Sequence, residues 1–232
     1  MENWNIIWDY DGTILPFTPY DSEQFLLNYL LAKKKKEVSF VKRIVAKAAI
    51  FADEKQLIGH SFKKYYLWVL KGADVSVIKE AANALSFVIP DTHINTLSFF
   101  AKKGFKMYII SCGTADLSVN SLKIKKADAF FSDIIANPFV YKNNKIDTMF
   151  FNVKSGIDKV KIAEKLNLKP EKTIAVGDGY TDIPLLDWSS FPFMIDPGKT
   201  RRKKLADKNY TFIESLPQIM DSMDIVEKRL KQ

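Results

Sequence analysis

The chain has 232 residues, of which 47% are hydrophobic and 13% aromatic, and this composition predicts a packed globular protein and excludes extensive disorder. The single cysteine, Cys112, excludes an intrachain disulfide, and with no signal-peptide pattern at the N-terminus it favours a cytoplasmic protein. The net charge of +8 admits nucleic acids, anionic membranes or anionic small molecules as partners, although lysines on solvated helix faces explain it more simply; no apolar run is long enough to span a bilayer.

The first part of the chain combines one strand with a long helical stretch. The apolar run at residues 5–9 predicts a strand. From about residue 20 to residue 87 the pattern is helical, with helices expected at 22–32, 39–52, 56–70 and 75–85. We therefore predict a helical cap of residues 17–87 inserted into an α/β core that comprises residues 1–16 and 88–232.

Strands and helices alternate along the rest of the chain. Helices are expected at 92–103, 115–125, 157–167 and 199–208, and strands at 106–111, 173–177, 191–195 and 210–213. Asn143 and Asn144 lie between two short apolar runs and predict a β-hairpin within residues 138–148. The alternation predicts an α/β fold with a doubly wound, mostly parallel sheet.

Two carboxylates follow the first predicted strand directly, in the segment Asp9-Tyr10-Asp11-Gly12-Thr13. Side chains alternate along a strand, so Asp9 and Asp11 face the same side. Two like charges so close together are costly unless a cation lies between them or they share a proton. A hard divalent cation bound by carboxylate oxygens solves this problem, and the segment therefore predicts a metal site.

Three further segments with polar side chains fall at expected strand ends or at a helix start. Ser111, Cys112 and Gly113 end the second strand, Lys159 lies in the first turn of the helix after Gly156, and Asp178 and Asp182 follow the strand at 173–177. The carboxyl ends of parallel strands share one edge of a sheet, so we expect these segments to meet there.

With these four motifs in this order, the chain resembles the haloacid dehalogenase (HAD) superfamily of phosphatases. It is similar in particular to the phosphoserine phosphatase-like subgroup, which has a Rossmann-like core and a helical cap between the first two motifs. The resemblance implies a Mg²⁺-dependent phosphatase that hydrolyses a small phosphorylated metabolite and has no expected nucleic-acid partner.

The resemblance also implies a role for each motif residue. Asp9 would be the nucleophile that forms an aspartyl-phosphate, and Asp11 the general acid and base. Ser111, Cys112, Gly113 and Lys159 would bind the phosphoryl group. Asp9, the backbone carbonyl of Asp11 and Asp178 would hold Mg²⁺, with Asp182 orienting the lysine or a metal-bound water. Lys154 remains an alternative to Lys159.

Other functions stay open at this point. A phosphotransferase of the same superfamily would use the same residues, and a nucleic-acid or anionic-membrane binding protein would use the basic runs at 33–36 and 201–204. Phosphoserine phosphatases place a carboxylate just after the first motif and an arginine in the cap to bind the substrate. Here residues 14–19 carry no charge and residues 62–70 contain no arginine, which speaks against phosphoserine as the substrate.

Overall fold

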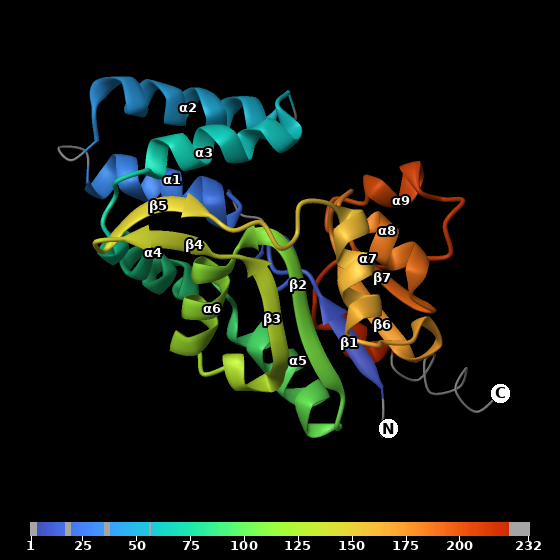
Figure 1. Cartoon of the computed structure of the whole chain (residues 1–232). Helices are drawn as coiled ribbons and strands as arrows, with labels where there is room; N and C mark the ends of the chain where they lie inside the picture. The colour runs from blue at the N-terminus through green and yellow to red at the C-terminus, as the bar shows by residue number, and fades with distance from the viewer. Residues whose placement is uncertain (1–3, 17–19, 35–37, 56, 223–232) are drawn as a thin grey trace.

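The computed structural model describes residues 4–16, 20–34, 38–55 and 57–222 (Figure 1). The start of the predicted cap, Lys35, Lys36 and Gln56 fall outside these ranges. No helix in the described part of the chain is long and apolar enough to cross a membrane.

Six parallel strands form the central sheet in the order β3-β2-β1-β6-β7-β8. They comprise β1 (Asn5–Trp8), β2 (Lys106–Thr114), β3 (Phe131–Asn137), β6 (Thr173–Gly177), β7 (Phe191–Ile195) and β8 (Thr211–Ile213). Every residue of β1 and β6 is buried, as expected for the central strands of a sheet covered on both faces. The predicted α/β fold with a mostly parallel sheet is therefore confirmed.

Helices cover both faces of this sheet. Ile6 and Trp8 belong to one apolar cluster, in which the Trp8 ring meets Phe100 of α5 (Asp91–Lys102) edge to face at 5.7 Å between centroids. Ile7, one residue away, belongs to a second cluster on α7 (Gly156–Lys165) and α8 (Ile183–Trp188). Neighbouring strand residues thus enter opposite layers, which makes the fold doubly wound.

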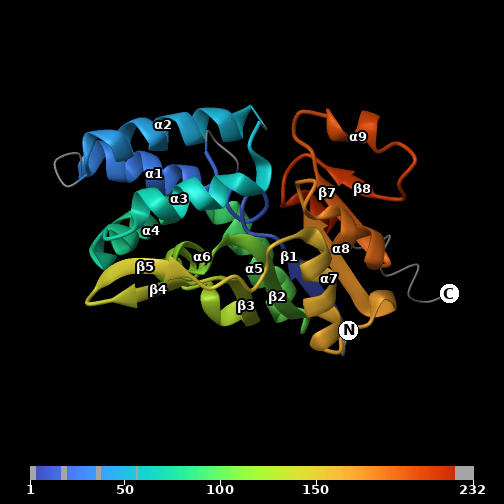
Figure 2. The same cartoon turned by 45° about the horizontal axis from the view of Figure 1, so that its top comes forward.

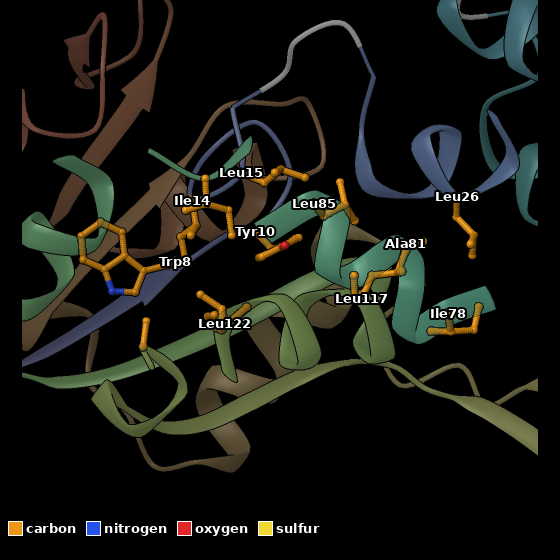
Figure 3. Close-up of a cluster of buried hydrophobic side chains, with 14 of the residues drawn as sticks. Trp8, Tyr10, Ile14, Leu15, Leu26, Ile78, Ala81, Leu85, Leu117 and Leu122 are labelled. Atoms are coloured by element: carbon orange, nitrogen blue, oxygen red, sulfur yellow. The ribbon is translucent and has the colours of Figure 1, made fainter. Parts of the chain in front are cut away.

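The helical stretch between β1 and β2 forms a layer beside the sheet (Figures 1 and 2). Its helices are α1 (Ser22–Lys33), α2 (Phe40–Glu54), α3 (Phe62–Leu70) and α4 (Val75–Val88). Side chains at their starts cap three of them, since Asp21, Ser39 and Asp74 accept hydrogen bonds from the first-turn amides of Gln24, Lys42 and Ser76. Residues of α4 pack on α6 (Ala115–Ile124), which joins this layer to the sheet through one continuous apolar cluster (Figure 3).

The predicted β-hairpin is present as β4 (Phe139–Lys142) and β5 (Lys145–Met149). Asn143 and Asn144 form its turn with φ of 50° and 59°, the left-handed region that asparagine tolerates. The hairpin binds the linker between α3 and α4, where Gly72 N donates to Ile146 O at 2.8 Å and Ile146 N donates to Ala73 O at 2.9 Å. It therefore attaches to the helical layer, far from its own place in the sequence.

Some predicted elements were wrong in extent. The helix expected at 56–70 is a 3₁₀ turn (Gly59–Ser61) followed by α3, and the helix expected at 199–208 is only α9 (Arg201–Lys204). Strand β3 was not predicted because it lies at the sheet edge, where partial exposure replaces a continuous apolar run with mixed residues. Short α10 (Gln218–Asp221) was not predicted either.

Candidate active site

Asp9, Ser111 and Asp178 lie together at the carboxyl edge of the sheet. Trp8 pairs with Ile109 of β2 on one side and with Val176 of β6 on the other, so the residues that follow these positions meet at the carboxyl edge of the sheet. The amide of Asp9 donates to Val176 O at 2.9 Å and fixes the backbone at this point. Asp9 and Ser111 are buried.

Lys159 joins two of the predicted site carboxylates. Its ammonium lies 3.0 Å from Asp9 Oδ1 and 2.6 Å from Asp182 Oδ1, and its side chain has 0% exposure. Burial alone would lower the pKa of Lys159, but the charges of Asp182 and Asp9 outweigh it and hold that pKa above its usual range. Lys154 is exposed, and of the two candidate lysines only Lys159 reaches the buried carboxylates.

Asp182 organises the loop that carries Asp178. Its Oδ2 accepts the backbone amides of Asp178 and Gly179 at 3.0 and 2.8 Å, while its Oδ1 accepts from Lys159. Gly177 allows this close approach, because a Cβ there would lie 2.3 Å from the carboxyl carbon of Asp182. With both oxygens engaged, Asp182 positions Lys159 and Asp178.

Asp178 faces the turn after β1. A Cβ on Gly12 would lie 2.2 Å from the carboxyl carbon of Asp178, and Gly12 has φ of +73°, so the site requires glycine here for two independent reasons. Burial raises the pKa of Asp178, and the charges of Asp182 and Asp9 raise it further. Arg201 Nη2 lies 3.5 Å from Asp178 Oδ2.

Asp11 reaches from the same turn to the first helix of the helical layer. Its carboxylate accepts hydrogen bonds from the amide of Ser22 at 2.7 Å and from the Ser22 hydroxyl at 2.9 Å. Burial raises the pKa of Asp11 to about 7; the hydrogen bonds from Ser22 oppose this, and the charges of Asp9 and Glu23 add to it. Burial also raises the pKa of Asp9, to about 6, with the charge of Asp182 adding to it and that of Lys159 opposing it.

The end of β2, where its pairing with β3 shifts register between Ile110 and Thr114, lies against these carboxylates. The Ser111 hydroxyl accepts the amide of Gly113 at 3.2 Å, and a Cβ on Gly113 would lie 2.7 Å from Asp11 Oδ2. Asn137 fixes this end of β2, because its amide group donates to Cys112 O at 2.7 Å and to Val153 O at 2.9 Å. The Cys112 thiol has a pKa raised by burial to about 11, which does not favour a nucleophilic thiolate.

A second polar cluster lies between the helical layer and the end of β2. Glu23 is buried, accepts the Thr114 hydroxyl at 2.6 Å and pairs with Lys63 of α3. The Tyr66 hydroxyl lies 3.0 Å from the Thr114 hydroxyl. Glu23 thus supplies a buried carboxylate near Asp11, although the segment just after the first motif is uncharged.

The residues of the site fit a divalent cation. Asp9, Asp178 and Asp182 form a cluster whose carboxylate oxygens lie within 4.8 Å of one another. Together with Asp11 they offer four carboxyl groups, against the two cations, Lys159 and Arg201, that contact them. The excess of carboxyl groups over cations and the oxygen donors suit Mg²⁺. Asp9 and Asp178 are its best side-chain ligands, because Asp182 already accepts three hydrogen bonds.

Ser22, Glu23, Lys63 and Arg201 were not predicted as site residues. Ser22 and Glu23 lie in the first turn of α1, where polar residues are usual, so only the burial of a charged residue marks Glu23. Within the basic run at 201–204, Lys203 and Lys204 are exposed, whereas Arg201 and Arg202 are only partly exposed. Arg201 contacts Asp178, and Arg202 contacts Asp196 and Glu214.

Comparisons with known proteins agree with this fold. A family model described as haloacid dehalogenase-like hydrolase matches residues 5–187. A solved substrate-bound phosphoserine phosphatase complex is 20% identical with a TM-score of 0.67, over 95% of this chain and 98% of that chain. A phosphoserine phosphohydrolase-like protein from Francisella tularensis is 18% identical with a TM-score of 0.68, over 95% and 99%. A protein described as having unknown function, from Bordetella pertussis, is 13% identical with a TM-score of 0.70, over 92% and 99%. A search of curated proteins gave no match.

Proposed function

The chain belongs to the haloacid dehalogenase-like hydrolases, and we propose that it is a Mg²⁺-dependent phosphomonoester hydrolase that acts on a small phosphorylated metabolite through an aspartyl-phosphate. The observation that carries this proposal is the contact between Lys159 and Asp9 in a buried site, with a second carboxylate, Asp11, in the same turn. One carboxylate is then available as nucleophile and the other for proton transfer.

In the proposed first step, a carboxylate oxygen of Asp9 attacks phosphorus while the bond from phosphorus to the leaving oxygen breaks. Asp11 donates its proton to that oxygen, and its pKa of about 7 supports a protonated form near neutral pH. Lys159 holds Asp9 in place and opposes the negative charge of the phosphoryl oxygens. The hydroxyl of Ser111 and the backbone amides after it would bind those oxygens.

In the second step, water attacks the aspartyl-phosphate and gives its proton to Asp11, and the bond between phosphorus and Asp9 breaks. Asp9, Asp178 and the carbonyl of Asp11 would hold Mg²⁺, which supplies charge neutralisation between the nucleophile and the phosphoryl group.

The polar cluster around Glu23 bears on the substrate. Glu23 and Lys63 neutralise each other, and Thr114 also donates to Glu23. A substrate ammonium group would have to displace Lys63, and a substrate carboxylate would have to draw Lys63 away from Glu23. This arrangement supports a small phosphate ester other than phosphoserine as the substrate. The single cysteine favours a cytoplasmic location for the reaction.

Hydrolysis of p-nitrophenyl phosphate tests the proposal. The wild-type protein should release phosphate only with Mg²⁺ present, and Asp9→Asn should abolish release while Asp207→Asn, at an exposed aspartate, leaves it unchanged. With glycerol added, phosphate and not glycerol phosphate should account for the substrate consumed, which separates hydrolysis from phosphotransfer. Turnover by Asp9→Asn at the wild-type rate would overturn the proposal.

A further inference from the structure

The outward face of α2 is apolar and exposed. Phe40, Val41, Ile44 and Phe51 are 67%, 59%, 52% and 59% exposed, and their spacing places them on one side of the helix. The inward side already has its own packing residues, Ala46, Ala49 and Ile50, which are buried. The helix therefore buries one apolar face and presents a second one to solvent.

The position of α2 leaves this second face without cover from the described residues. In both views α2 lies at the outer margin of the helical layer, with α1 and α3 on its inner side (Figures 1 and 2). We call the stripe formed by Phe40, Val41, Ile44 and Phe51 the α2 outer face. Leu57, just beyond the helix, is also apolar and is 71% exposed. Contiguous exposed apolar residues on one helix face indicate a binding surface.

Positive charge accompanies α2 in the sequence. Residues 33–55 contain eight basic and three acidic residues, so this stretch of 23 residues carries a net charge of +5 out of +8 for the whole chain. Cations also accompany the exposed rings: Arg43 lies 5.5 Å from the ring centre of Phe40, and Lys55 lies 6.0 Å from that of Phe51. On α3, Trp68 is partly exposed and has Lys42 at 5.9 Å.

This pairing of rings and cations matches the chemistry of an anionic bilayer surface. Apolar side chains insert among the acyl chains just below the headgroups, while long basic side chains extend to the phosphate and carboxylate groups above them. A helix of 15 residues such as α2 is long enough to lie flat in that interface. We propose that the α2 outer face binds the surface of anionic lipid membranes.

The shape and charge of the surface favour a membrane over a folded protein partner. The α2 outer face is the convex side of one helix, so a protein would have to supply both a long apolar groove and an acidic rim to match it. A bilayer supplies an apolar layer and a plane of anionic headgroups without a preformed groove. Self-association through the apolar stripe alone would bring two copies of residues 38–55 together, each with four basic and two acidic residues, and this like charge is unfavourable.

Vesicle flotation with the full-length protein tests this proposal. The assay measures binding alone and does not depend on the phosphatase activity. The wild-type protein should bind vesicles of equal parts phosphatidylcholine and phosphatidylserine at low salt, bind pure phosphatidylcholine vesicles far less, and detach at high salt. The triple variant Phe40→Gln, Ile44→Gln, Phe51→Gln should lose about tenfold or more of the binding. A second variant, Lys42→Gln, Arg43→Gln, Lys47→Gln, should bind these vesicles more weakly at low salt, and its remaining binding should depend less on salt.

A matched control replaces three exposed apolar residues elsewhere, Phe87, Ile124 and Phe150, with Gln and should bind like the wild type. Circular dichroism and thermal unfolding confirm that each variant is folded. Failure of the wild-type protein to bind anionic vesicles at low salt, or equal binding by the variant Phe40→Gln, Ile44→Gln, Phe51→Gln, would overturn the proposal. A wild-type dimer that this variant converts to a monomer, with no vesicle binding by either, would assign the face to self-association instead.

Discussion

The ammonium of Lys159 lies 3.0 Å from Oδ1 of Asp9, and both side chains are buried at the carboxyl edge of the sheet. The same ammonium binds Asp182, which in turn holds the loop of Asp178 through two backbone amides. One lysine thus links the proposed nucleophile to the proposed metal ligand. Its removal should affect stability and activity together.

Replacement of Lys159 by Met should abolish phosphatase activity and lower the free energy of unfolding by about 3 kcal/mol, because Asp9 and Asp182 would remain buried without their cation. Lys154→Met, at an exposed lysine, should change neither quantity. Chemical denaturation and p-nitrophenyl phosphate hydrolysis measure the two effects. Adding Asp182→Asn to Lys159→Met should restore part of the stability and none of the activity. If Lys154→Met were the inactive variant, the assignment of the lysine would be wrong.

Asp11→Asn should stabilise the metal-free protein at neutral and higher pH. The pKa of Asp11 is raised from 3.8 to about 7 in the folded state, chiefly by burial. Between these values the folded protein holds a proton that the unfolded chain has released, so the free energy of unfolding falls as the pH rises through this window. Asn removes that dependence and should gain about 2 kcal/mol above pH 7.

The gain from Asp11→Asn should shrink as the pH falls towards 4 and approach zero below about pH 3, where Asp11 is protonated in both states. Chemical denaturation across this pH range, in the presence of a chelator, measures it. Equal gains at pH 4 and at pH 8 would contradict the assignment of a raised pKa to Asp11.

Two glycines with positive φ provide a matched test of the close approach at the metal site. Gly12 and Gly104 have φ of +73° and +82°, but only a Cβ on Gly12 would meet Asp178. Gly104→Ala should therefore cost about 1 kcal/mol of stability from its backbone conformation and leave Mg²⁺ affinity unchanged. Gly12→Ala should cost more and weaken Mg²⁺ binding, which calorimetric titration measures. Unchanged Mg²⁺ affinity in Gly12→Ala would contradict a role for Asp178 as a ligand.

Arg201 should compete with the cation for Asp178. Its guanidinium is 3.5 Å from Asp178 Oδ2, and Asp196 fixes its backbone by accepting the amides of Thr200, Arg201 and Arg202. Arg201→Gln should tighten Mg²⁺ binding by roughly threefold, since the partly exposed ion pair is worth less than about 1 kcal/mol. Lys203→Gln, at an exposed lysine of the same helix, serves as the control. Weaker binding in Arg201→Gln would show instead that Arg201 supports the site.

The sequence predicted the central part of the fold because buried strands leave a clear signal. β1, β6 and β7 are short apolar runs, and β7 begins and ends at the predicted residues. Edge strand β3 and the helix at Arg201–Lys204 follow no such pattern, since partial exposure and tertiary contacts decide their extent. The hairpin was predicted from its two asparagines, but its attachment to the linker between α3 and α4 depends on contacts distant in sequence.

The candidate site, like the fold, could be predicted from the sequence only in part. Residues in the four motifs are recognisable because their chemistry requires fixed spacing after a strand or at a helix start. Ser22, Glu23, Lys63 and Arg201 come from helices whose orientation brings them to the site, and no local pattern marks them. The pair of Glu23 and Lys63 is the part of the site that bears most on the substrate, and it depends entirely on how α1 and α3 pack.

The most direct test of the central claim locates the covalent phosphoryl group. The protein is mixed with p-nitrophenyl phosphate and Mg²⁺, quenched in acid and reduced with borohydride, which converts an aspartyl-phosphate to homoserine that peptide mass spectrometry can locate. The account predicts homoserine at Asp9 in the wild-type protein and none in Asp9→Asn. Homoserine at Asp11, or phosphate release with no modified aspartate in the steady state or in rapidly quenched samples, would contradict it.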